Sequence, residues 1–199
     1  QQHASDIAAI AEMEGFRNSV VVAHAGGGPV GIAFCHDFPA LAASFVLVDS
    51  AVSAPANLEN PTKPNEHLYA EMIKNLQSKN GEHYFKDLYT GFFGPQADPV
   101  MVGQAVSDAC KTAPDIRVKE IQLLAEGTAA RAAAMLQPSL VMFGPWMANA
   151  LPDAGKPERI RTWFKRTEVA QAIGCGHFLQ MEVPDQVNAF IRSFVSRMS

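Results

Sequence analysis

The chain has little charge, and what it has is spread out. Of its 199 residues 18% are charged, the formal net charge is −4, and the 16 lysines and arginines form no cluster. A surface that binds nucleic acid or an anionic membrane needs a basic patch. The sequence therefore predicts no nucleic-acid partner and no membrane partner, and it favours a small neutral ligand.

The sequence also has no long apolar run and few cysteines. No stretch approaches the roughly 20 apolar residues that span a bilayer, and no basic-then-apolar leader opens the chain. The three cysteines, Cys35, Cys110 and Cys175, are odd in number and show neither metal-binding nor redox spacing. We expect buried free thiols in a reducing, cytoplasmic location, with no metal or organic cofactor.

Apolar runs that alternate with helix-like segments are present. With 48% apolar residues, the chain can form one globular domain with a core. Strands separated by helices favour an α/β fold with a mostly parallel sheet. The expected strands are 20–22, 45–49, 140–144 and 167–173, and the expected helices include 3–15, 29–38, 99–110, 116–135 and 184–198.

The first of these helices has apolar residues at near-helical spacing. Ile7, Ile10, Ala11 and Phe16 recur along one side of it. This periodicity predicts that they form its buried face, and it leaves Asp6 in water.

A glycine-rich turn, residues 23–28, separates the apolar run 20–22 from the helix-like segment that follows. It reads Ala-His-Ala-Gly-Gly-Gly. A sharp strand-to-helix turn with small residues two before and two after its apex is typical of a nucleophile elbow, G-x-S-x-G. Ala23 and Gly27 supply the small residues, but the apex is Ala25, which cannot act as a nucleophile.

A second motif lies near the end of the chain. Residues 174–178 read Gly-Cys-Gly-His-Phe, and Glu-Val-Pro-Asp follows at 182–185. Together with the turn, this segment resembles the histidine loop and last helix of the α/β-hydrolase family. The four expected strands would then correspond to the family's fifth to eighth strands.

The resemblance implies an α/β fold with a mostly parallel sheet of the α/β-hydrolase type and a helical lid. It places the hydrolase core at 1–51 and 138–199 and the lid at 52–137. The family's first strands have no counterpart in this sequence. We expect a missing N-terminal segment or another chain to cover the edge of the strand at Val20, because an open apolar edge promotes aggregation.

The family's catalytic roles carry over to particular residues. The resemblance makes His177 the general base, Ala25 the nucleophile position and the backbone N–H of Gly26 an oxyanion donor. Where many members carry the acid after the seventh strand, this chain has Met147. Some relatives carry it after the sixth strand, which here gives Asp49, with Asp153 as the reserve candidate.

Other residues receive architectural or binding roles. His24 is expected to pack beneath the turn, and His36 and Glu182 are expected to be architectural. The aromatic cluster around 84–93 is either a pocket wall or the lid's own core. The predicted substrate contacts are Phe92, Phe93, Trp146 and Met72.

The function implied is hydrolysis of a carboxylic ester or lactone of a hydrophobic small molecule by a Ser-His-Asp mechanism. The chain itself would then be an inactive variant with alanine in place of serine at position 25. One alternative is a dehalogenase or carbon–carbon hydrolase of the same fold, although dehalogenase elbows usually place tryptophan where Gly26 stands. The other is a ligand-binding protein without catalysis.

Overall fold

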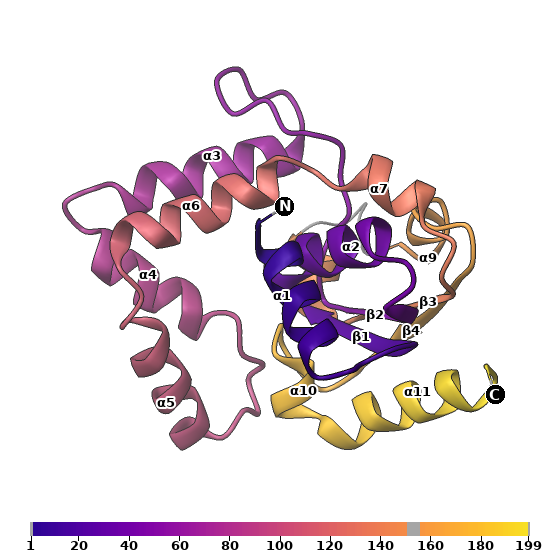
Figure 1. Cartoon of the computed structure of the whole chain (residues 1–199). Helices are drawn as coiled ribbons and strands as arrows, with labels where there is room; N and C mark the ends of the chain where they lie inside the picture. Colours follow the sequence, from indigo (N-terminus) through magenta and orange to yellow (C-terminus); the bar gives the residue numbers. More distant parts are fainter. Residues whose placement is uncertain (1, 151–155, 199) are drawn as a thin grey trace.

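Four strands form one parallel sheet. The computed structural model describes residues 2–150 and 156–198. Its strands are β1 (Ser19–His24), β2 (Ala42–Val48), β3 (Ser139–Phe143) and β4 (Thr167–Gln171). They pair in the order β1-β2-β3-β4, each parallel to its neighbour (Figure 1). The expected α/β class and all four expected strands are confirmed.

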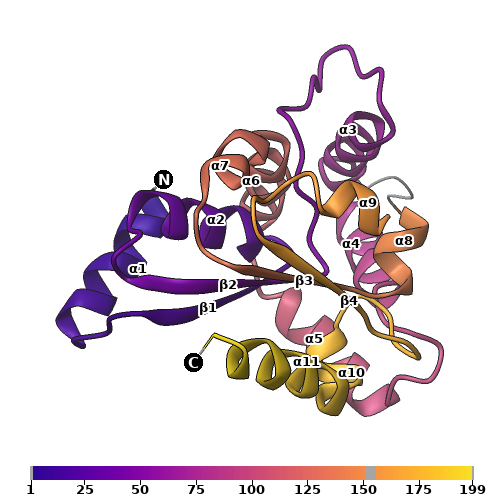
Figure 2. The ribbon, with the colours of Figure 1, turned by 90° about the vertical axis from the view of Figure 1, so that its right-hand side faces the viewer.

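Helices cover both faces of the sheet (Figure 2). On one face lie α1 (Gln2–Met13), α2 (Gly27–Asp37), α7 (Ala129–Ala134) and α9 (Pro157–Ile160), and on the other lie α10 (Leu179–Glu182) and α11 (Pro184–Ser196). Because successive side chains of a strand point to opposite faces, Phe45 and Leu47 pack toward α2, whereas Val46 and Val48 pack toward α11. The two central strands, β2 and β3, are almost entirely buried and mostly apolar for this reason.

A group of four helices stands beside the sheet (Figure 1). These are α3 (Pro64–Leu76), α4 (Gly81–Thr90), α5 (Pro99–Ala109) and α6 (Pro114–Ala125), and we call them the lid helices. They bury their own small clusters, one around Tyr69 and Met72 and one around Leu76 and Phe85. Buried Arg117 packs against the second of these clusters, because its guanidinium lies 4.0 Å from the centre of the Phe85 ring.

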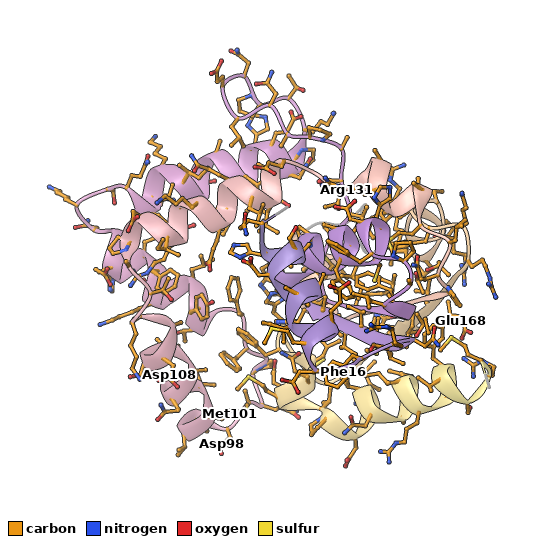
Figure 3. The ribbon with its side chains drawn as sticks, viewed as in Figure 1. Phe16, Asp98, Met101, Asp108, Arg131 and Glu168 are labelled. Atoms are coloured by element: carbon orange, nitrogen blue, oxygen red, sulfur yellow. The ribbon has the colours of Figure 1, made fainter. Side chains whose placement is uncertain are left out.

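The lid helix α5 buries none of its residues. Figure 3 shows Asp98, Met101 and Asp108 along this end of the lid. The side chain of Asp98 caps the helix by accepting a hydrogen bond from the Val100 N–H at 2.9 Å.

The expected single helix over 116–135 is wrong. It is divided into α6 and α7 at Gly127, whose φ of 72° lies in the left-handed region that glycine adopts without strain. The N–H groups of Thr128 and Ala129 then both donate to the carbonyl of Ser53. The second part, α7, packs against α2 in the main core rather than among the lid helices.

The expected buried face of α1 is confirmed for Ala11 but wrong for Ile7, Ile10 and Phe16. Ala4, Ala8 and Ala11 pack toward α2, whereas Ile7 and Ile10 are exposed, Ile10 to 58%. Small alanines let two helices approach closely, so they take the inner face.

β1 is an edge strand of the sheet, and it carries exposed apolar side chains. β1 pairs only with β2 among the described residues, and Val22 is 53% exposed. A strand edge of this kind is a template for pairing with further chain. That an N-terminal segment or another chain covers it stays a prediction.

The three cysteines all lie among the described residues. All three cysteines are free, and Cys35 and Cys175 are buried as expected, whereas Cys110 is only half-buried. Burial raises the pKa of Cys35 to about 12 and that of Cys175 to about 11. No cluster of potential metal ligands occurs within residues 2–150 and 156–198. Over the same residues, no helix is both long and apolar enough to cross a bilayer.

Candidate active site

Ala25 occupies a strained turn at the carboxyl end of β1. Its φ is 48°, a left-handed conformation that residues with a side chain seldom adopt. Two backbone hydrogen bonds hold it there: its N–H donates to the Val48 carbonyl at 3.1 Å, and its carbonyl accepts from the Gly28 N–H at 2.9 Å. Strain of this kind persists only where the surroundings impose it.

The small residues that this turn needs are not all the expected ones. A Cβ at Gly27 would meet open space, so the expected steric demand there is absent. At Gly28 a Cβ would lie 2.4 Å from the Ser50 hydroxyl oxygen, and at Gly31 it would lie 2.9 Å from the Cβ of Ala23. The positions that must be small are therefore Gly28, one residue after Gly27, and Gly31, one helical turn further along α2.

His177 and Asp49, which are 128 positions apart, meet beside this turn. Nδ1 of His177 lies 2.6 Å from Oδ2 of Asp49, and both side chains are buried. The other carboxylate oxygen, Oδ1, accepts from the Gly144 N–H at 2.6 Å. Burial raises the pKa of Asp49, and the hydrogen bonds from His177 and Gly144 oppose that rise. Asp49 thereby fixes the orientation of the imidazole.

A second histidine, His24, lies directly beside the first. The two rings are 4.7 Å apart, and Nε2 of His24 lies 2.9 Å from the carbonyl oxygen of His177. Because a carbonyl can only accept, that nitrogen must carry a hydrogen. Burial, with the nearby His177 as the next cause, lowers the pKa of His24 to about 4. His24 is thus neutral and hydrogen-bonded to the loop that carries His177. That it packs beneath the turn stays a prediction.

The lowered pKa of His24 makes the free energy of unfolding depend on pH. Between the ordinary pKa of 6.5 and the folded-state pKa of about 4, the unfolded chain binds a proton that the folded chain does not. The free energy of unfolding should therefore fall as the pH falls through this window, by at most about 3 kcal/mol. Urea unfolding at pH 7, 6 and 5 measures the slope. A His24→Gln variant should have a shallower slope, and equal slopes would contradict the assignment.

A cavity of about 920 Å³ opens over the turn and the histidine. Residues of the turn, the histidine loop, α1, the lid helices and α8 (Pro145–Ala150) line it. Its wall is mostly apolar, which suits a hydrophobic ligand. Ala25, Asp49 and His177 all contribute to that wall.

The predicted binding residues divide into two groups. Phe92, Trp146 and Met72 line the cavity, and the Phe92 and Trp146 rings lie 5.0 and 4.5 Å from the His177 ring. Phe93 is not among the described lining residues. Its ring stacks at 4.6 Å on the ring of Phe178, and Phe178 does line the cavity.

Sequence reasoning missed the lining residues Phe178 and Ser50. Tyr89 also lines the cavity, and it belongs to the aromatic cluster that was expected to form either a pocket wall or the core of the lid. The signal for Ser50 was available, because a residue next to a candidate acid at a strand end lies at the same edge of the sheet.

Comparison with solved structures places this arrangement in a known fold. No protein-family model matches the chain, and no curated protein matches it in sequence. A bromoperoxidase from Bacillus anthracis matches with a TM-score of 0.80 at 13% identity, over 97% of this chain and 72% of that one. A thermophilic esterase from Thermogutta terrifontis matches with a TM-score of 0.74 at 17% identity, over 98% and 71%. The chain has the α/β-hydrolase fold.

A third structure extends the comparison. Est816, described as an N-acyl homoserine lactone degrading enzyme, has a TM-score of 0.74 at 19% identity and is matched over 73% of its length and 97% of this chain. At such identities the likeness establishes the fold. The activities belong to the matched proteins.

Within the α/β-hydrolase fold, the remaining predicted site residues have these positions. Gly26 directly precedes α2, and its N–H makes no hydrogen bond with any described residue. Met147 is buried and lines the cavity. Asp153, the reserve acid, lies outside the described residues.

Proposed function

We propose that this chain is a serine-hydrolase scaffold for carboxylic esters or lactones, with alanine at the nucleophile position. The observation that carries the proposal is the His177–Asp49 hydrogen bond beside the left-handed turn at Ala25, with all three residues in one cavity. A base oriented by a buried acid, next to an elbow apex, is the constellation that activates a serine hydroxyl.

The reaction proposed for the Ala25→Ser form has two halves. The serine oxygen attacks the ester carbonyl while Nε2 of His177 takes its proton, and Asp49 stabilises the imidazolium. The Gly26 N–H donates to the oxyanion. The imidazolium then protonates the leaving alcohol, and a water molecule, deprotonated by His177, releases the acyl group as the acid.

Ligand binding without catalysis is the second candidate. Ala25 itself favours it, because the chain with this sequence has no nucleophile at the apex. Calorimetry with the Ala25 chain and a neutral ester, followed by chromatography of the recovered ester, separates binding from turnover.

The charge of the cavity indicates the substrate class. No lysine or arginine occurs among the described lining residues, whereas Asp6 and Glu120 contribute carboxylates. Burial raises the pKa of Glu120. A free carboxylate on a substrate would lose water here without gaining a cationic partner. We therefore propose a neutral, hydrophobic ester or lactone.

This substrate class predicts selectivity in the Ala25→Ser form. The kcat/KM for p-nitrophenyl hexanoate should exceed that for the mono-p-nitrophenyl ester of adipic acid by at least about tenfold, or about 1.4 kcal/mol. Glu120→Gln should reduce this ratio by removing a carboxylate. A preference for the anionic ester would contradict the proposal.

The same form tests the reaction class. It should hydrolyse neutral chromogenic esters and lactones, and the Ala25 chain should not. Halide release by an Ala25→Asp form, with no esterase activity from the Ala25→Ser form, would instead favour the dehalogenase alternative.

A further inference from the structure

Glu182 connects two segments that are far apart in the sequence. Its Oε2 accepts from the Gly94 N–H at 2.8 Å, just beyond α4, and both its oxygens lie 3.0 Å from the Gly176 nitrogen in the histidine loop. Hydrogen bonds to an ionised acceptor are stronger than neutral ones. One carboxylate thus holds the lid against the loop that carries His177.

The two segments lie backbone to backbone at this point. A Cβ on Gly176 would be 2.2 Å from the carbonyl oxygen of Phe92, and a Cβ on Gly94 would be 2.9 Å from the Gly176 nitrogen. The His177 N–H donates to that same Phe92 carbonyl at 2.6 Å. A lid segment, residues 92–94, is therefore hydrogen-bonded to the backbone of His177, the candidate general base.

This contact also determines what surrounds the imidazole. The Phe92 ring lies 5.0 Å from the rings of both His177 and Trp146. Movement of residues 92–94 would therefore displace two groups at once, the Phe92 ring that lines the cavity and the Phe92 carbonyl that accepts from the His177 N–H. Glu182 is not among the lining residues of the cavity, so its effect on a reaction would be indirect.

We propose that Glu182 is a positioning residue, which fixes lid segment 92–94 to residues 176–177 and thereby holds His177 in its orientation toward position 25. Its kinetic consequence rests on the proposed function. Its structural consequence does not, and it can be measured in the Ala25 chain.

The matched control is Glu66, a second carboxylate that accepts backbone N–H groups. Glu66 accepts from Thr62 at 2.8 Å and from Lys63 at 3.0 Å, at the start of α3 and outside the histidine loop. Glu66→Gln removes the same kind of interaction from the lid without touching residues 92–94 or 176–177.

The experiment compares Glu182→Gln with Glu66→Gln by NMR. In the Ala25 chain, Glu182→Gln should speed amide exchange at Gly94 and His177 by at least about tenfold. A short hydrogen bond to Asp49 should move the Nδ1 proton signal of His177 far downfield, and Glu182→Gln should shift or broaden that signal. Glu66→Gln should leave both readouts unchanged. Unchanged exchange and an unchanged proton in Glu182→Gln would overturn the proposal.

The kinetic arm uses the Ala25→Ser background. There Glu182→Gln should lower kcat by about tenfold with little change in KM, because orientation rather than binding is lost. Glu182→Asp, which keeps the charge but reaches less far, should fall between the two forms; it also replaces Glu182→Gln in both arms if that variant does not fold. An inactive Ala25→Ser form would contradict the proposed function alone, and the exchange result would still decide the role of Glu182.

Discussion

Replacing Ala25 by serine is expected to raise the rate of neutral ester hydrolysis by roughly 10⁴-fold or more over the Ala25 chain, because serine would complete the proposed Ser-His-Asp triad, whose members act as a unit. The backbone at position 25 already has the left-handed φ of 48°. Serine adds only a hydroxyl to the existing Cβ, so the turn should not change. Initial rates with p-nitrophenyl hexanoate measure the effect.

The same glycine run provides a matched control for this gain. Gly27→Ser adds a hydroxyl two residues further on, where a Cβ meets open space, so the variant should fold. It should remain inactive, because its hydroxyl would not be at the apex. Equal activity from the two serine forms, or none from a folded Ala25→Ser form, would count against the assigned nucleophile position.

Replacing Asp49 by asparagine is expected to lower kcat/KM of the Ala25→Ser form by about 10³- to 10⁴-fold. The buried carboxylate lies 2.6 Å from Nδ1 of His177 and keeps the hydrogen on that nitrogen. An amide NH₂ facing Nδ1 would place the hydrogen on Nε2 instead. Nε2 could then no longer accept the serine proton.

Asp6→Asn is the control for this loss. Asp6 is a second carboxylate that lines the cavity, yet it has no assigned catalytic role, so its replacement should change kcat/KM by less than about tenfold. If Asp49→Asn has an equally small effect and Asp153→Asn has a large one, the acid is Asp153.

The strands and the meeting of the candidate catalytic residues could be predicted from the sequence. The apolar runs and the helix-like segments between them define the four strands, of which β2 and β3 are the buried ones, and the residues after parallel strands gather at one edge of the sheet. That places Ala25 after β1 and Asp49 after β2 at the edge where the His177 loop also lies. The motif around His177 supplied the remaining partner.

Features that depend on close packing could not be predicted in this way. Periodicity identified the apolar stripe of α1, but the smaller alanines, not Ile7 and Ile10, take the face toward α2. The division between α6 and α7 depends on the backbone of Gly127. The contact between Glu182 and Gly94 joins residues 88 positions apart, and no local pattern records it.

Covalent labelling at position 25 tests the central claim most directly. The Ala25→Ser form, the Ala25 chain and the Ala25→Ser/His177→Gln double variant are incubated with a fluorophosphonate and digested for mass spectrometry. The account predicts one adduct, on the serine at position 25, that is absent from the Ala25 chain and much slower to form in the double variant. An adduct on another residue, or equally fast labelling without His177, would contradict it.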